Sequence, residues 1–186
     1  MTKIAIFASG SGSNAENIIE YFQGVEEVDI VLVLSNNPDA FVLERANKHR
    51  IPTFTFTKDQ LVNSTKVIDA LKEINASIII LAGFLLKIPL SMVNAFPNRI
   101  VNIHPALLPK YGGKGMYGLN VHRAVVENKE LESGITIHYV NENYDEGAYI
   151  HQESCDVLPE DSAEDVQKKV QALEVKHFPS IIESIL

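Results

Sequence analysis

The sequence predicts an α/β protein with an open, mostly parallel, doubly wound sheet and helices on both faces. Through the first two thirds of the chain, short runs of branched aliphatic residues alternate with segments of helical periodicity. The run "SIIILAG" is almost wholly apolar, which is typical of a parallel strand buried on both faces. After Pro105 the pattern changes to polar and apolar alternation, which indicates an antiparallel addition to the same sheet.

The expected elements follow in chain order. We expect parallel strands at residues 4–8, 29–34, 53–56, 77–83 and 99–102. Helices are expected between them at residues 15–22, 41–48 and 59–74, and a short one after Pro89. The later part is expected to hold a helix at 119–127, strands at 134–140 and 148–157, and an amphipathic helix at 162–185. Ser162 and Asp165 have the spacing of a capping box at the start of that last helix. The chain has no repeat and no linker, so we expect a single domain over residues 1–186.

Charge and composition argue against several classes of protein. The formal net charge is −8 and no basic segment stands out, so we expect no nucleic-acid partner. The longest apolar stretch, residues 78–86, is far shorter than the roughly 20 residues of a membrane-spanning helix. The single cysteine, Cys155, rules out an internal disulfide, and no segment resembles a signal peptide, so we expect a cytoplasmic protein. Cys155 lies in a predicted strand, where we expect it to be a core residue.

A glycine-rich turn follows the first predicted strand and precedes the first helix. Gly10, Gly12 and Ala15 give the pattern G-x-G-x-x-A, which occurs in dinucleotide-binding turns. A dinucleotide site also needs an acidic residue at the end of the second strand, where this chain has the segment "SNN" at residues 35–37. The turn therefore fits a single phosphate better than a nicotinamide cofactor, and a tight turn without a ligand remains an alternative.

The segment "RIVNIHPALLPKYGG" is the most informative of the chain. Asn102 and His104 are two residues apart on a strand, so their side chains share a face, and Pro105 ends the strand there. Because ligands of open α/β sheets bind beyond the carboxyl ends of the strands, we expect this pair and the glycine turn to open on one crevice. The alternative for His104 is a histidine satisfied by a backbone partner.

Asp145, in the loop "NENYDEGAYI", is the candidate partner of His104. Initiating a turn is the commonest task of such an aspartate, and it is the alternative here. If Asp145 reaches His104, its carboxylate should raise the histidine pKa and hold the ring protonated. The remaining histidines are scattered without a metal-ligand spacing, so we expect no metal site. We expect His138 to occupy a half-exposed strand position, and the alternative is that it lines the same pocket.

Several motifs in the right order resemble the phosphoribosylglycinamide formyltransferase family, folate-dependent enzymes of purine synthesis. They are "GSGSN", "LAGFLLKIP", "NIHPALLPKYGGKGMYG", "GITIHYVNENYDEGAYI" and "VQALE", and the resemblance runs from about residue 3 to the end of the chain. The family fold is an open, mostly parallel sheet with helices on both sides, in agreement with the pattern above. The chain departs from many members in two respects: residues 57–69 contain lysines but no arginine, and the loop at 110–118 is longer.

The resemblance also implies roles for individual residues. The catalytic group would be Asn102, His104 and Asp145. The phosphate-bearing ribosylglycinamide would be bound by Gly12, Ser13, Asn14 and Glu174, although a solvated helix-face charge is the alternative for Glu174. The folate would be bound by Leu85, Leu86, Lys87, Ile88, Asn102, Asn141, Glu142, Asn143, Tyr144 and Asp145. The co-substrate would be 10-formyltetrahydrofolate, with no metal, and the chain would act on small molecules as a monomer or homodimer.

The implied reaction moves the formyl group of 10-formyltetrahydrofolate to the glycine amine of 5'-phosphoribosylglycinamide. The products are N-formyl phosphoribosylglycinamide and tetrahydrofolate, in de novo purine (IMP) biosynthesis. Asn102 would donate to the developing oxyanion, and a protonated His104 would stabilise the same charge. The alternatives are a formyltetrahydrofolate hydrolase-like enzyme and a non-catalytic nucleotide- or folate-binding module.

Overall fold

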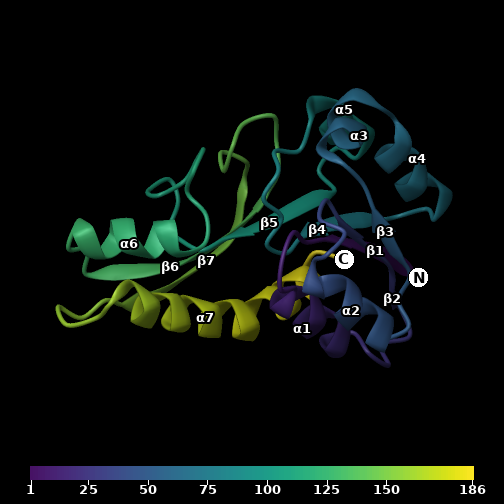
Figure 1. Ribbon diagram of the computed structural model, residues 1–186. Helices are drawn as coiled ribbons and strands as arrows, with labels where there is room; N and C mark the ends of the chain where they lie inside the picture. The colour runs from purple at the N-terminus through teal and green to yellow at the C-terminus, as the bar shows by residue number, and fades with distance from the viewer. The chain divides into compact units, whose positions relative to one another are not determined.

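A computed structural model describes all residues, Met1–Leu186, as two compact units. Unit 1 comprises Met1–Asn102 with Leu186, and unit 2 comprises Ile103–Ile185. The strands form a seven-stranded sheet in the order β3-β2-β1-β4-β5-β6-β7 (Figure 1). The boundary between the units falls within strand β5, Ile100–His104. The single domain over residues 1–186 stays a prediction.

Unit 1 contains the parallel strands of the sheet and the helices that connect them. Its complete strands are β1 (Thr2–Phe7), β2 (Val28–Ser35), β3 (Thr53–Thr55) and β4 (Ile78–Leu81). Its helices are α1 (Ser13–Tyr21), α2 (Phe41–Lys48), α3 (Lys58–Asn63), α4 (Lys66–Glu73) and α5 (Leu90–Ala95). Every pairing among β1, β2, β3, β4 and β5 is parallel, which confirms the predicted order of strands and helices.

The direction of winding reverses at β1. From β1 the chain proceeds outward to β2 and β3, then returns to place β4 on the other side of β1. Because parallel crossovers are right-handed, this reversal puts the later helices on the opposite face of the sheet. Figure 1 shows α1 and α2 on one side of the unit 1 strands and α3, α4 and α5 on the other, so the predicted double winding is confirmed.

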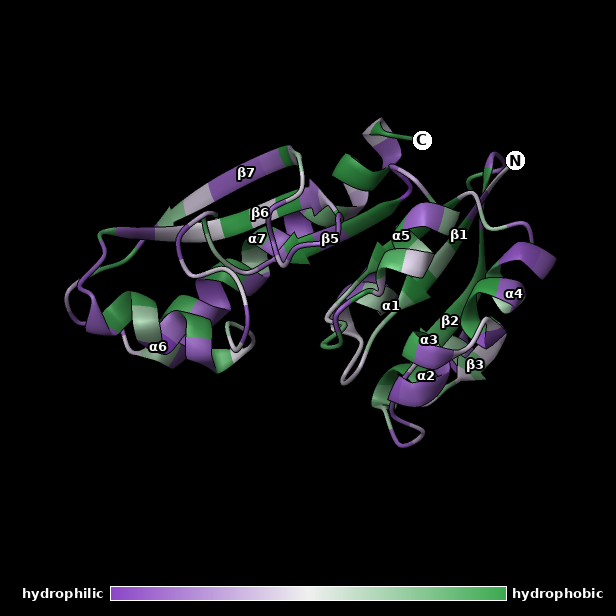
Figure 2. Ribbon diagram, turned by 90° about the horizontal axis from the view of Figure 1, so that it is seen from above, coloured by the Kyte–Doolittle hydropathy of each residue, from purple (hydrophilic) through white to green (hydrophobic).

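The core of unit 1 consists of the strand interiors. Ile79 and Ile80 of β4 have no exposed surface, and β1 and β2 are strongly hydrophobic in Figure 2. The Phe7 ring lies 5.7 Å from that of Phe56 and 5.2 Å from that of Phe84, between ring centroids. These aromatic contacts join the ends of β1, β3 and β4 and fix the loops that follow them.

The expected helix at 59–74 is wrong in one respect, because it is two helices. The capping box of Thr57 and Gln60 starts α3, and Ser64 then adopts an extended backbone that ends it. The Ser64 hydroxyl donates to the Gln60 carbonyl, and the Thr65 hydroxyl donates to Asp69. The Ser64 hydroxyl thus takes the Gln60 carbonyl that the Ser64 amide would use in a continuous helix, and α4 begins at Lys66.

Unit 2 contains the antiparallel part of the sheet and the longest helix. Its elements are α6 (Leu119–Glu127), β6 (Glu132–Tyr139), β7 (Tyr149–Asp156) and α7 (Ala163–Ser184). β6 and β7 pair antiparallel, as predicted, and the capping box of Ser162 and Asp165 starts α7. β7 is largely hydrophilic in Figure 2, and Cys155 on it is half-buried rather than the core residue expected. No helix of the structure has the length and apolar character needed to cross a membrane.

Gly12 gives the glycine turn its shape. Its backbone is left-handed, with φ of 73°, where it caps α1. The Val42 amide donates to the Gly10 carbonyl, and Arg45 Nε donates to the Ser11 carbonyl, so α2 holds the turn in place. A Cβ at Gly12 would lie 2.4 Å from the Val42 Cβ. Glycine is therefore required here both by backbone conformation and by the approach of α2.

We expect Gly12→Ala to lower the free energy of unfolding by about 2–4 kcal/mol, from left-handed strain and from the clash with Val42. Gly24 is the matched control, because its φ is also positive, at 86°, and a Cβ there meets nothing within 4 Å. Gly24→Ala should therefore lower the free energy of unfolding only by the strain of a left-handed backbone. Urea unfolding of both variants, and of Gly12→Ala with Val42→Ala, measures the difference. Equal losses in the two alanine variants would contradict the role of Val42.

Candidate active site

Strand β5 carries the two central side chains of the candidate site. Asn102 and His104 stand two residues apart on it, hence on one face, and the strand ends at His104 as predicted. His104 is only 4 % exposed, whereas Asn102 is half-buried. The following loop is tied to β6, because the Thr136 hydroxyl donates to the Ala106 carbonyl and accepts from the Leu108 amide. This loop therefore leaves the end of β5 in a fixed direction.

Asp145 is placed by the connection between β6 and β7. Gly147 lies so close to the end of β6 that a Cβ there would be 1.6 Å from the Tyr139 carbonyl oxygen. Asp145 itself has a left-handed backbone, with φ of 55°. Its Oδ2 accepts a hydrogen bond of 2.9 Å from the Gly113 amide. The tight connection and this amide together point the carboxylate into unit 2.

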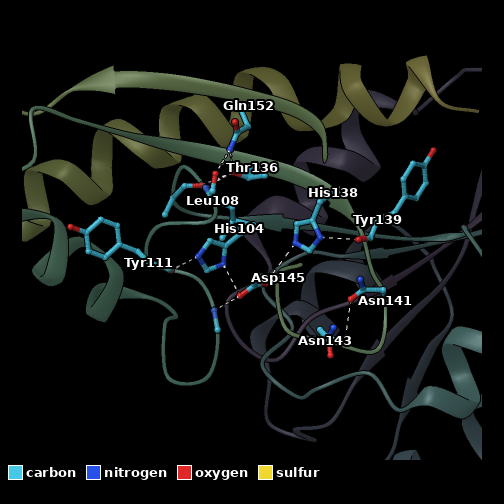
Figure 3. A network of polar contacts seen from close by, with 12 residues as sticks. His104, Leu108, Tyr111, Thr136, His138, Tyr139, Asn141, Asn143, Asp145 and Gln152 are labelled. Carbon is cyan, nitrogen blue, oxygen red and sulfur yellow. Dashed lines mark hydrogen bonds and ion pairs between the residues drawn. The ribbon is translucent and has the colours of Figure 1, made fainter. Parts of the chain in front are cut away.

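The structure brings Asp145 to His104 and also to His138. His104 Nδ1 lies 3.6 Å from Asp145 Oδ2, and His138 Nε2 lies 3.6 Å from Oδ1 (Figure 3). The expected contact between Asp145 and His104 is therefore confirmed. The half-exposed position expected for His138 is wrong, because β6 is buried on both faces and the residue is 2 % exposed. The alternative, a position beside the other candidate residues, is the one observed. His138 Nδ1 donates to the Tyr139 carbonyl at 2.9 Å.

The hydrogen bonds define the neutral form of His104. Its Nε2 lies 2.8 Å from the Tyr111 carbonyl oxygen, which only accepts, so Nε2 carries the proton. Nδ1 then holds the lone pair and faces the Asp145 carboxylate. When Nδ1 accepts a proton, the positive charge of the imidazolium forms beside the negative charge of the carboxylate. A buried base needs such a counter-charge.

Asp145 does act to raise the pKa of His104, as expected, but the expectation that it holds the ring protonated is wrong. Burial lowers the pKa of His104 below its ordinary value and outweighs the opposite effects of Asp145 and the Tyr111 carbonyl. For Asp145, burial acts to raise the pKa, but the hydrogen bond to His138, the charge of His104 and the Gly113 amide outweigh it and lower the pKa. At neutral pH the pair consists of a neutral imidazole beside an ionised carboxylate.

Sequence reasoning missed the residues that hold Tyr111 against His104. The Tyr111 hydroxyl donates to Glu130 Oε1 at 2.8 Å, and Lys110 Nζ lies 3.0 Å from Glu130 Oε2. Tyr111 also has a left-handed backbone, with φ of 56°. No spacing in the sequence links residue 130 to this loop, since the contact exists only once α6 has returned the chain to it.

In unit 1 the glycine turn meets the segment after β4. The Ser9 amide donates to the Gly83 carbonyl at 3.1 Å, and the Leu85 amide donates to the Ser9 hydroxyl at 3.0 Å. β1 and β4 are the strands between which the winding reverses, and ligands of open α/β sheets bind at that point. Gly12, Ser13 and Asn14 stand at the start of α1, where the backbone amides of a first helical turn have no partner within the helix.

The remaining predicted residues lie in three places. In the segment 85–88, which is predicted to bind folate, Leu85 and Lys87 are exposed, Leu86 is half-buried and Ile88 is 3 % exposed. In the Asp145 loop, the Asn143 amide donates to Asn141 Oδ1 at 2.9 Å, while Glu142 and Tyr144 are exposed. Glu174 is half-buried on α7 in unit 2. The meeting of these groups with the glycine turn in one crevice stays a prediction.

The end of β2 argues against a dinucleotide. Ser35 Oγ accepts from the Asn37 amide, and the Ser9 hydroxyl donates to Asn36 Oδ1 at 2.6 Å. These short polar groups bond to one another, and no carboxylate stands where a ribose diol would need one.

Histidines outside the cluster of His104, His138 and Asp145 are less scattered than the sequence suggests. His151 and His177 lie with Glu153 in unit 2, and His49 lies with Glu16 and Glu20 in unit 1. Each set places three possible ligand atoms within 4.8 Å of one another.

Comparison with known proteins gives one consistent result. Residues 2–182 match the model of the family described as formyl transferase. The chain is 40 % identical to "Phosphoribosylglycinamide formyltransferase, chloroplastic" of Arabidopsis thaliana over 98 % of its length, and spans 65 % of that relative. It is 34 % identical to phosphoribosylglycinamide formyltransferase of Bacillus subtilis (strain 168), covering 100 % of this chain and 95 % of the relative. The crystal structure of that enzyme from Anaplasma phagocytophilum superposes with a TM-score of 0.90 at 32 % identity, covering 99 % and 86 % of the two chains.

His122 predicts how stability depends on pH. It is 2 % exposed on α6, its Nδ1 has no hydrogen-bond partner, and burial together with the charge of His104 lowers its pKa to about 4. The unfolded chain binds a proton there below pH 6.5 and the folded chain does not, so stability falls as pH decreases from about 6.5 toward 4. We expect His122→Gln to reduce the loss of unfolding free energy between pH 7 and pH 5 by on the order of 1 kcal/mol. Urea unfolding at both pH values measures it, and an unchanged loss would contradict the burial of a neutral ring.

Proposed function

Because the chain belongs to the formyl transferase family, we propose that it transfers the formyl group of 10-formyltetrahydrofolate to the glycine amine of 5'-phosphoribosylglycinamide. The products are N-formyl phosphoribosylglycinamide and tetrahydrofolate, a step of de novo purine (IMP) biosynthesis. The observation that carries the proposal is the approach of Asp145 to His104, 3.6 Å apart, at the end of the strand that also holds Asn102. A neutral base, an ionised carboxylate and an amide donor are the groups that formyl transfer needs.

In the proposed mechanism His104 acts as a base before it acts as an acid. An amine attacks the formyl carbon only in its neutral form, and the ammonium proton that forms on attack must be removed. His104 Nδ1 accepts that proton, and Asp145 stabilises the imidazolium that results. The imidazolium then returns the proton to the folate nitrogen as the bond from that nitrogen to the formyl carbon breaks. The same imidazole thus removes the proton from the amine and delivers it to the folate nitrogen.

Asn102 stabilises the charge that develops on the formyl oxygen. Its amide is carried by β5, which lies between β4 and β6 in the sheet. A donor held by such a strand needs no reorganisation when the tetrahedral intermediate forms, which is the condition for effective oxyanion stabilisation.

We assign the substrates to the groups identified by resemblance and supported by their placement. Gly12, Ser13 and Asn14 at the start of α1 hold the phosphate, and Glu174 contacts the same substrate. The folate is bound by the two segments at residues 85–88 and 141–145. The turn holds a single phosphate, since the end of β2 lacks the acid that a dinucleotide requires.

We also infer the partners, oligomeric state and cellular location of the enzyme. Its partners are small molecules, and it functions as a monomer or homodimer. We place it in the cytoplasm, although the Arabidopsis relative carries the word chloroplastic in its name.

A hydrolase-like enzyme and a binding module remain the competing functions. The motif of Asn102, His104 and Asp145 also fits attack by water on the same formyl group. The two are separated by following tetrahydrofolate release from 10-formyltetrahydrofolate with and without phosphoribosylglycinamide. Release only with the amine supports transfer, release without it indicates hydrolysis, and no release from folded protein indicates a binding module.

We expect Asp145→Asn to lower kcat by about 10²–10⁴-fold and to change KM by less than about threefold, because the imidazolium loses its counter-charge. Glu146→Gln is the matched control: it removes an exposed carboxylate from the next position of the same loop and should leave kcat unchanged. Steady-state kinetics of both variants provide the test. Wild-type turnover by Asp145→Asn would contradict the role of the carboxylate.

A further inference from the structure

His151 and Glu153 on β7 and His177 on α7 form a second cluster in unit 2, which the formyl transfer reaction does not use. We propose that these three side chains bind one divalent transition-metal ion, and that Zn²⁺ is the ion that fits them best. The site is independent of the proposed transfer reaction.

The ligand atoms already lie near coordination geometry. His151 Nε2 is 3.7 Å from Glu153 Oε2, and His177 Nε2 is 3.9 Å from the same oxygen. Around a tetrahedral zinc ion with bonds of about 2.0–2.1 Å, neighbouring ligand atoms stand about 3.3–3.4 Å apart. Contractions of a few tenths of an ångström bring each nitrogen to the required distance from the carboxylate oxygen. The two nitrogens, which lie within 4.8 Å of each other, must also approach by up to about 1.5 Å, a movement that side-chain rotation supplies as the ion binds.

Two buried nitrogens lack the partner that an ion would supply. Nε2 of His151 and Nε2 of His177 are both shielded from solvent and have no hydrogen bond. Their rings are stacked, 5.5 Å between centroids and 25° between planes, and the two nitrogens lie within 4.8 Å of each other and of a Glu153 carboxylate oxygen. An unsatisfied buried polar atom costs free energy, and two of them aimed at one carboxylate call for an explanation. A bound cation satisfies all three groups together.

The fold presents these ligands on elements that are fixed in place. His151 and Glu153 are two apart on β7, on the same half-buried side of the strand. On α7, His177 is followed by Phe178 and Pro179, both buried, which anchor that turn of the helix. Farther back on α7, Lys169 forms an ion pair with Asp161 and donates to the Asp156 carbonyl at the end of β7. Strand and helix are thus joined without the metal, so the site is largely formed in advance.

Direct hydrogen bonding does not account for the cluster. The His151 and His177 nitrogens lie 3.7 Å and 3.9 Å from Glu153 Oε2, beyond hydrogen-bond distance, and neither has another hydrogen-bond partner. Two imidazoles and one carboxylate are ligands that Zn²⁺ takes readily, with a fourth position left for water.

The set of His49, Glu16 and Glu20 in unit 1 does not carry the same inference. Arg45 forms an ion pair with Glu16, and Lys48 Nζ lies 3.7 Å from the other Glu16 oxygen. A cation there would compete with two positive side chains for one carboxylate. This set therefore supplies a control histidine for the test.

The test is equilibrium dialysis of ZnCl₂ against the full chain after treatment with a chelator. We expect one Zn²⁺ per chain in the wild type. His151→Gln and His177→Gln should each weaken binding at least tenfold, since each removes one of three ligands. His49→Gln should bind as the wild type does, and so should Asp145→Asn, which alters only the catalytic cluster. The thermal midpoint should rise with Zn²⁺ in the wild type and control variants but not in the two ligand variants.

Each outcome decides the matter. No bound zinc in the wild type, or wild-type affinity in both ligand variants, would overturn the proposal, as would a loss of binding in His49→Gln or Asp145→Asn alone. Far-ultraviolet circular dichroism checks that the ligand variants fold. Glu153→Gln, which keeps shape and volume, should also weaken binding and serves if either histidine variant is unfolded. Transfer activity is not the readout, so failure here leaves the proposed function standing.

Discussion

The placement of the Asp145 carboxylate is the constraint on which the candidate site depends. Its two oxygens face three groups from different segments: His104 at the end of β5, His138 on β6 and the Gly113 amide in the loop between β5 and α6. The close approach of Gly147 to the Tyr139 carbonyl fixes the backbone two residues after Asp145. Because each neighbour meets it through a defined atom, a shift of this side chain would disturb all three segments together.

Burial decides the chemistry of the pair. Asp145 and the Tyr111 carbonyl both favour the charged form of His104, yet desolvation outweighs them and the ring stays neutral. A neutral ring beside an ionised carboxylate is a base whose conjugate acid is stabilised as it forms, which suits proton transfer during attack by an amine. Burying this polar cluster costs free energy of desolvation. The hydrogen bonds that both histidines donate to backbone carbonyls offset part of it.

The sequence predicted those features that local pattern determines, and missed those that depend on packing. The parallel strands follow from their aliphatic runs, and the pairing of Asn102 with His104 follows from two-residue spacing before Pro105. The direction of the His104 pKa depends on how deeply other elements bury it, which spacing does not express. The burial of His138 was missed because β6 is buried on both faces, which its sequence pattern does not show. The helix break at Ser64 was missed because it depends on a hydrogen bond of the Ser64 hydroxyl. Two members of the set of His151, Glu153 and His177 lie on β7 and the third lies well inside the following helix, α7, so no compact linear motif reveals it.

The most direct test of the central claim is an NMR titration of the His104 ring nitrogens in the wild type and in Asp145→Asn. We expect a midpoint below 6.5 for His104 in the wild type, with Nε2 protonated in the neutral form. We expect a still lower midpoint in the variant, because the carboxylate that opposes burial is gone. A wild-type midpoint above 6.5 would contradict a neutral His104, since the ring would then enter the reaction as an acid that is already protonated.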